Sequence, residues 1–71
     1  MATDVEAHIT GTVFKVETRV GADVAEGDVL VILESMKMEM PVESPVAGKV
    51  SEVRVEEGQS VEEDEVLVVI D

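Results

Sequence analysis

The chain has 71 residues, no cysteine and a formal net charge of −12, from 17 acidic and five basic residues. A chain of this length buries only about 60% of its unfolded surface, which predicts a single domain over residues 1–71. Without cysteine there are no disulfides or thiolate metal sites, and a reducing cytoplasm is the expected location. The negative charge disfavours nucleic acid and anionic membranes as partners, and it is also compatible with a halophilic source.

The first ten residues, MATDVEAHIT, contain neither the basic nor the apolar region of a signal peptide. The longest apolar runs, residues 29–33 and 66–70, have five residues each and are too short for a membrane span. Apolar residues make up 45% of the chain, 16 residues are valine, and no segment shows helical periodicity. The composition therefore predicts a soluble, all-β protein.

The chain contains an internal repeat with a constant offset of 37 residues. Residues 11–34 align without a gap with residues 48–71, and nine of the 24 aligned positions are identical. The identities include turn glycines such as Gly21 and Gly58, which chance similarity between valine-rich strands does not explain. We therefore predict two structural copies related by a quasi-two-fold axis, packed as a small antiparallel sandwich or flattened barrel.

Each copy contains two main strands joined by a turn and a short connector. The predicted strands are residues 12–18, 29–33, 49–55 and 66–70. Val24 and Val61 are the expected inward anchors of the two connectors. Gly27 of the first copy corresponds to Asp64 of the second, and aspartate is one of the few residues that tolerate the left-handed backbone region.

The segment ESMKMEM, residues 34–40, lies between the copies and has no counterpart in the repeat. The chain must reverse here and pair again before Pro41 and Pro45, which cannot donate hydrogen bonds in a central strand. This predicts a β-hairpin with its tip near Met36 and Lys37. The repeat places this tip at one end of the molecule and the termini, Met1 to Asp4 and Asp71, at the other.

Lys37 is the candidate functional residue, because the sequence shows no catalytic residues, phosphate loop or metal site. A buried Schiff-base lysine needs a pocket, and the only histidine, His8, is interpreted as an ordinary surface or strand residue. The open alternatives are a covalently modified lysine and a simple exposed one. Exposed methionines are unusual in turns and form adaptable contact surfaces, which favours modification. We assign that role to Met36 and Met38, whereas Met40, and in part Met38, continue the core alternation.

Residues 34–38, ESMKM, resemble the attachment motif of the biotinyl domains of biotin-dependent carboxylases. The flanking glycines, the strand and the Pro-Val pair of residues 20–50 resemble the same family, and the similarity extends over residues 7–71. The resemblance implies a flattened β-barrel of two four-stranded antiparallel sheets with quasi-two-fold symmetry.

The resemblance also implies a function. Lys37 would be joined to biotin through an amide bond by a biotin protein ligase that uses ATP. Met36 and Met38 would serve ligase recognition and presentation, and Glu34 and Ser35 would form the flank of the motif. A biotin carboxylase would load carboxylate onto the ureido nitrogen, and a carboxyltransferase would pass it to an acceptor, with an acyl-CoA carboxylase as the expected system. The protein would be a monomeric carrier rather than an enzyme.

Three alternatives differ in what the lysine carries. A lipoyl domain has the same fold but usually flanks its lysine with Asp and Ala, so Met36 and Met38 favour biotin. A protein that accepts either biotin or lipoate and an unmodified β-sandwich interaction module are the other two. Residues 7–11, AHITG, depart from the usual family pattern, and residues 17–23 leave no room for the thumb loop of some family members. Because no Ala/Pro-rich linker is present, we expect a small free-standing carrier.

Overall fold

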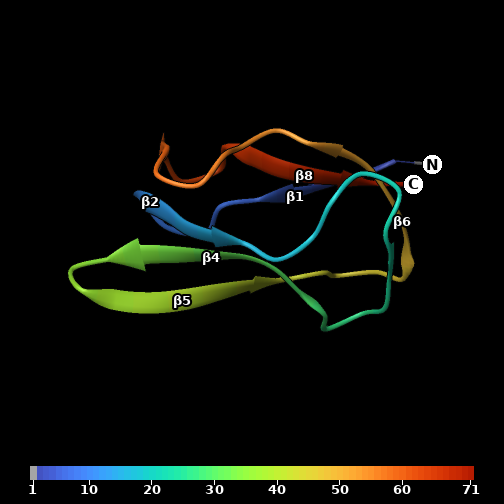
Figure 1. Ribbon diagram of the computed structural model, residues 1–71, viewed down its shortest axis with the longest axis horizontal. Coiled ribbons are helices and arrows are strands. Elements are labelled where there is room, and N and C mark those ends of the chain that lie inside the picture. The colour runs from blue at the N-terminus through green and yellow to red at the C-terminus, as the bar shows by residue number, and fades with distance from the viewer. Residues whose placement is uncertain (1) are drawn as a thin grey trace.

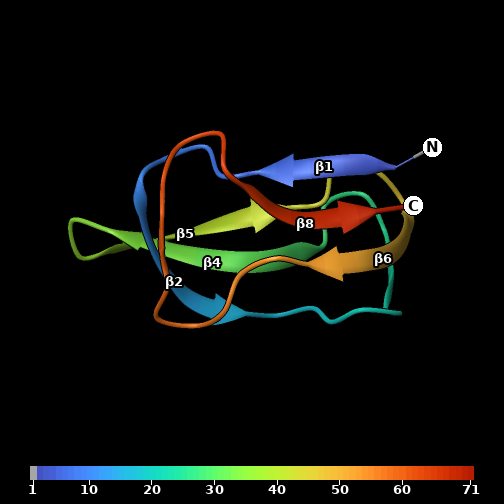
Figure 2. The same cartoon turned by 90° about the horizontal axis from the view of Figure 1, so that it is seen from above.

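Two four-stranded antiparallel sheets form the structure, a computed structural model that describes residues 2–71 (Figures 1 and 2). The strands are β1 (Thr3–Glu6), β2 (Gly11–Val16), β3 (Asp23–Val24), β4 (Val29–Ser35), β5 (Met38–Glu43), β6 (Gly48–Val53), β7 (Ser60–Val61) and β8 (Val66–Ile70). One sheet has the order β1-β8-β6-β3 and the other β5-β4-β2-β7. The predicted fold class is confirmed. Within the described part of the chain, no helix could cross a membrane.

The internal repeat is visible in the strands and in their hydrogen bonds. Strands β2, β3 and β4 recur 37 residues later as β6, β7 and β8, and the short third and seventh strands each join the sheet of the other copy. The amide of Gly21 donates to the carbonyl of Val50 at 2.8 Å, and the equivalent amide of Gly58 donates to the carbonyl of Val13 at 2.8 Å. The two copies therefore hold each other in place, as a quasi-two-fold barrel requires.

The turn before the second long strand of each copy uses a positive backbone φ. Gly27 has a φ of 92° and Asp64 a φ of 74°, which confirms that aspartate takes the left-handed conformation at this position. The amide of Gly27 donates to Ser44 and the amide of Asp64 donates to Ala7, both at 2.8 Å. The repeat thus preserves the conformation of this turn although its residue changes.

The observed strand ends differ from the predicted ones in two ways. The first strand of each copy leaves its sheet after Val16 or Val53, although Val55, beyond the end, is still buried. Strand β4 also continues two residues beyond its predicted end, to Ser35, and the predicted pairing before Pro41 is present and extends through Pro41 to Glu43. Proline is tolerated there because β5 is the edge strand of its sheet.

The core lies between the two sheets and is almost entirely aliphatic. Consecutive residues are buried in the long strands, such as Leu30 and Val31 in β4 and residues 67–70 in β8. A register shift in the β4–β5 pairing between Val29 and Val31 marks a bulge, where neighbouring side chains need not alternate between faces. The core residues are Val5, Ala7, Val13, Leu30, Val31, Leu33, Val42, Val50, Val55, Val61, Leu67, Val68 and Ile70.

The molecule is elongated, with extents of 33 × 17 × 17 Å. The β4–β5 turn lies at one end of the long axis, whereas β1 begins and β8 ends at the opposite end (Figures 1 and 2). The predicted separation of the Lys37 turn from residues 2–4 and Asp71 is therefore confirmed. Met1, which was predicted to lie with them, is outside the described residues.

Candidate functional site

A two-residue turn joins β4 to β5 and contains Met36 and Lys37. Both residues have a positive φ, 53° for Met36 and 66° for Lys37, as in the type I′ turns that fit the twist of a two-stranded hairpin. Ser35 pairs with Met38 immediately below the turn. The predicted hairpin tip is thus confirmed at the predicted residues.

The residue types at this turn are unfavourable for its backbone conformation. Left-handed conformations cost an L-residue other than glycine about 1–2 kcal/mol, and Asn-Gly is the usual choice for type I′ turns. The six paired positions between β4 and β5 fix the hairpin in spite of this penalty. Met36 and Lys37 therefore occupy positions where turn stability alone favours other residues, which points to a functional requirement for these side chains.

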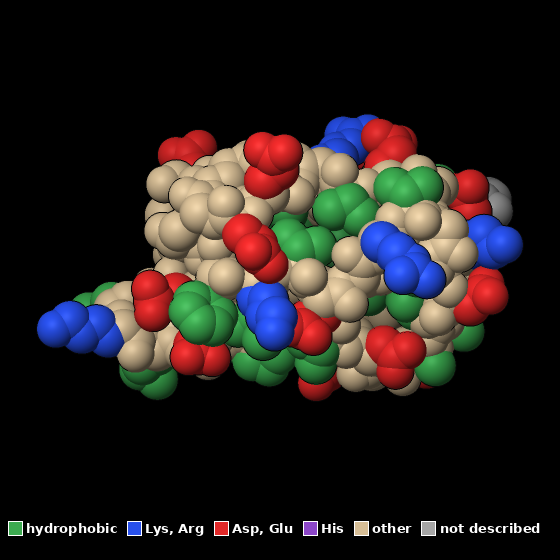
Figure 3. All heavy atoms as spheres, viewed as in Figure 1, with side chains coloured by type: hydrophobic (Ala, Val, Ile, Leu, Met, Phe, Trp, Pro, Cys, Tyr) green, Lys and Arg blue, Asp and Glu red, His purple; other side chains and the backbone are tan. Residues whose placement is uncertain are grey.

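Lys37 is accessible from nearly every direction. It is exposed, and its two methionine neighbours are 92% exposed at Met36 and 61% exposed at Met38. Its ammonium group forms no hydrogen bond or ion pair with any residue from 2 to 71. Figure 3 shows a basic side chain at the far end of the projecting hairpin, with hydrophobic side chains beside it. Other proteins can therefore approach the amine without any rearrangement of this chain.

One face of the hairpin carries the apolar residues of β5. Met38, Met40 and Val42 alternate along the strand and share this face. The exposed fraction falls from 61% at Met38 to 5% at Val42, with Met40 half-buried between them. The assignment of Met40 to the core, and of Met38 partly to it, is therefore wrong: neither belongs to the buried cluster. The hairpin extends beyond the opposite sheet, so its outer residues have nothing to pack against (Figure 1).

The stem of the hairpin also carries a pair of like charges. Glu34 lies directly opposite Glu39, both are exposed, and Thr12 of β2 pairs with Glu34 on its other side. Like charges in such a cross-strand pair are destabilising. The motif predicted Glu34 and the half-buried Ser35 as flanking residues, but it gave no role to Glu39. The two-residue turn, once located, would have predicted the pairing, because it sets the register of the strands.

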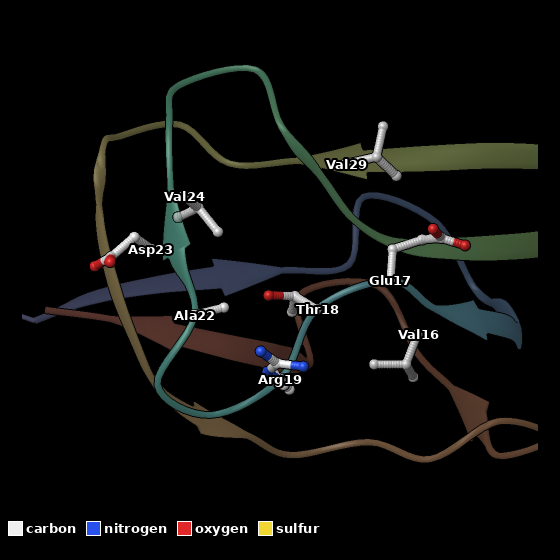
Figure 4. A pocket seen from close by; sticks show the side chains of 8 residues that line it. All are labelled: Val16, Glu17, Thr18, Arg19, Ala22, Asp23, Val24 and Val29. Carbon is white, nitrogen blue, oxygen red and sulfur yellow. The ribbon is translucent and has the colours of Figure 1, made fainter.

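Two shallow depressions lie on the body of the protein, and neither includes a residue of the turn. The larger, of about 400 Å³, is lined by residues between Val16 and Val29. In Figure 4, Thr18, Ala22 and Val24 point toward one another across it. The two copies differ here, because Thr18 is half-buried whereas its counterpart Val55 is 4% exposed.

The smaller depression, of about 290 Å³, lies between the edge strands β1 and β5 and includes His8. His8 is an exposed residue of the loop after β1, which agrees with its interpretation as an ordinary surface residue. Among residues 2–71 there is no group of three or more His, Cys, Asp or Glu side chains that could hold a metal ion. Within the described residues, the exposed turn combines a reactive amine with a backbone conformation that stability does not explain.

A lysine at the tip of a projecting hairpin, on a barrel of two symmetric halves, is the arrangement expected of a domain that carries a covalently attached group. Residues 1–70 match the family model described as biotin-requiring enzyme. The chain belongs to this biotin/lipoyl-attachment family, as the ESMKM motif indicated. The family expectation is therefore confirmed.

Similar proteins and structures agree with this membership. The chain is 55% identical over 42 residues to the biotinylated protein TB7.3 homolog of Mycolicibacterium smegmatis and 52% identical over 42 residues to the biotinylated protein TB7.3 of Mycobacterium tuberculosis. Each match spans 59% of this chain and 59% of the relative.

Two solved structures contain a domain with the same fold. A single-chain, multi-domain long-chain acyl-CoA carboxylase matches with a TM-score of 0.90 and 37% identity, over 96% of this chain and 7% of that one. The urea carboxylase of Kluyveromyces lactis matches with a TM-score of 0.94 and 34% identity, over 100% of this chain and 6% of that one. The present chain thus corresponds to a small part of each large carboxylase.

Proposed function

We propose that Lys37 is the residue to which biotin is attached and that the protein carries carboxylate between the active sites of a biotin-dependent carboxylase. The observation that carries this proposal is the exposed two-residue turn, in which Lys37 stands between two exposed methionines on a strained backbone. Membership of a biotin-requiring family and similarity to biotinylated proteins support biotin as the cofactor. Glu34 and Ser35 flank the turn on the stem, where they pair with Glu39 and Met38.

The role of Lys37 in attachment is that of a nucleophile. The ammonium group first loses a proton to become a neutral amine. Its Nζ then forms an amide bond with the carboxyl carbon of biotin, the nitrogen loses a second proton, and the carboxyl oxygen leaves with the nucleotide that ATP supplies to the ligase. Since no residue from 2 to 71 pairs with the ammonium group, the ligase supplies the base that accepts these protons. Met36 and Met38 provide apolar contact on both sides of the amine without obstructing it.

Once attached, biotin supplies the ureido nitrogen on which carboxylate travels. The carrier itself needs no active site, and we propose that it has none. Its contribution is to keep a tethered group at a high effective concentration near each partner's active site, which linkage to a small, rigid barrel achieves. The projecting hairpin places the attachment point at the far end of the long axis, which keeps the barrel clear of the partner's active site (Figure 1).

The proposed partners are a biotin protein ligase, a biotin carboxylase and a carboxyltransferase. Similarity to parts of a long-chain acyl-CoA carboxylase and a urea carboxylase supports the carboxylase context, and we propose an acyl-CoA as the acceptor. With a formal charge of −12, two copies of this chain repel each other, which favours a monomeric single domain over residues 1–71.

Intact-mass measurement tests the attachment site. The protein is incubated with a biotin protein ligase, biotin and ATP, and the same reaction is run on Lys37→Arg, Lys15→Arg and Lys49→Arg. We expect one biotin on the wild type and on both control variants and none on Lys37→Arg. A lipoate ligase reaction is run in parallel. Modification of Lys37→Arg, exclusive modification by lipoate, or no modification by either ligase would each contradict the proposal.

A further inference from the structure

We propose that Gly11 positions the Met36–Lys37 turn for modification by letting β2 pass directly against the backbone of the hairpin stem. This inference rests on the proposed attachment of biotin to Lys37. It states that the orientation of Lys37 depends on a residue far from it in sequence. Gly11 does not touch Lys37, so its role is one of positioning.

The contact between Gly11 and the stem is between backbones. A Cβ atom at Gly11 would lie 2.6 Å from the carbonyl oxygen of Glu34, 3.3 Å from its carbonyl carbon and 3.5 Å from the Cβ of Ser35. The φ of Gly11 lies outside the left-handed range, so the requirement for glycine here is one of space. A glycine inside a strand commonly marks such a close approach of two backbones.

Gly11 lies where the body of the protein stops supporting the hairpin. The neighbouring Thr12 pairs with Glu34, which is the last pairing of β2 with β4 before the turn. Beyond this point β4 and β5 pair only with each other, and Met36 and Met38 are largely exposed. The direction in which Lys37 projects is therefore set at the contact between Gly11 and Glu34.

An alanine at position 11 would change this direction. Cβ atoms of proteins rarely approach another atom more closely than 3.0–3.4 Å, so the 2.6 Å contact requires the backbones of residue 11 and Glu34 to move apart by 0.4–0.8 Å. Lys37 lies opposite Met36 in the turn, two residue steps beyond Glu34 along the hairpin, roughly 7 Å at the rise of a strand. A tilt at the stem therefore moves the amine by at least as much as it moves the stem. Misplacement of a reacting group by about 1 Å can lower a rate by about 100-fold.

The internal repeat supplies a matched control. Gly48 is the counterpart of Gly11, and a Cβ there would collide with the carbonyl oxygen of Asp71 and lie 2.8 Å from the Cγ2 of Ile70. The same kind of crowding thus occurs at the opposite end of the molecule, where no attachment turn is present (Figure 2). Both alanine variants should lose stability, but only Gly11→Ala should disturb the position of Lys37.

The test measures ligase-catalysed biotinylation of the wild type, Gly11→Ala and Gly48→Ala at equal concentrations of folded protein. We expect kcat/KM to fall about 10-fold or more for Gly11→Ala and to stay within twofold of the wild type for Gly48→Ala. The loss should be in kcat rather than KM, because the exposed side chains that contact the ligase are unchanged.

Equal rates for the two alanine variants would overturn the inference while leaving attachment at Lys37 intact, whereas an unmodified wild type would overturn the proposed function itself. If either variant is partly unfolded, all three proteins are assayed in trimethylamine N-oxide, which favours the folded state. If Gly11→Ala remains unfolded in this osmolyte, Gly11 is required for folding of the whole barrel and not specifically for the orientation of Lys37. This result also overturns the inference.

Discussion

The strained turn predicts that the protein can be stabilised at its own functional site. Met36 has a φ of 53°, and replacing it with asparagine puts a residue that tolerates the left-handed region at that position. Met36 is 92% exposed, so the substitution removes almost no buried apolar surface. The backbone penalty of about 1–2 kcal/mol for an ordinary L-residue is partly relieved, and we expect the free energy of unfolding to rise by about 0.5–1 kcal/mol.

Urea unfolding followed by circular dichroism measures this change. With an m-value of about 1 kcal/mol/M for a small protein, the midpoint should move upward by about 0.5–1 M. Met38→Asn is the matched control, because Met38 is also exposed but lies in a strand, where asparagine is unfavourable. Biotinylation of Met36→Asn should be slower than that of the wild type, since an exposed apolar contact is lost. A Met36→Asn protein no more stable than the wild type would refute the strain at the turn.

Three further predictions concern the body, the stem and the modified lysine. Thr18→Val should stabilise the protein by about 0.5 kcal/mol, because valine covers apolar surface in the larger depression. Val55→Thr, at the equivalent buried position, should destabilise it by about 1–3 kcal/mol. Thermal unfolding compares the two variants, and effects of the same sign would contradict the equivalence of the two positions. Glu39→Gln should stabilise the hairpin by about 0.2–1 kcal/mol, because it removes the repulsion from Glu34. This gain in stability should shrink in 1 M salt, where the screening length is about 3 Å. A gain that does not depend on salt would contradict charge repulsion as its cause. Biotinylation of Lys37 should change the free energy of unfolding by less than about 0.5 kcal/mol, because an exposed side chain loses few contacts, and a large shift in melting temperature would show that the tip packs against the barrel.

The repeat made much of the fold predictable from the sequence. The 37-residue offset predicted the equivalence of the two copies, the left-handed Asp64 and the placement of the Lys37 turn opposite Asp71. These features follow from the residue types in the turns and from the order of the strands along the chain, both of which can be read from the sequence. Glycines and valines at equivalent positions were sufficient for them.

Features that depend on where one strand meets another were not predictable. Met40 continues the apolar alternation of β5, but its burial depends on how far the opposite sheet extends, and there the sheet has ended. Gly11 was visible only as one identity of the repeat, because its contact with the Glu34 carbonyl depends on how closely two segments far apart in the sequence approach each other. The pairing of Glu34 with Glu39 needed the position of the turn to within one residue, since a shift of one residue changes every partner.

The symmetry also explains how stability and function are separated within so short a chain. Strand β8 ends at Ile70, the counterpart of Leu33, whereas β4 continues for two more residues to Ser35 before the turn. Up to Leu33, β4 and β8 occupy equivalent positions and most of their side chains are buried, whereas beyond Leu33 the hairpin is largely exposed. Substitutions at the tip should therefore alter modification with little loss of stability, and substitutions in the core should do the reverse. Gly11 lies at the boundary between the two regions, which is why its replacement should affect both.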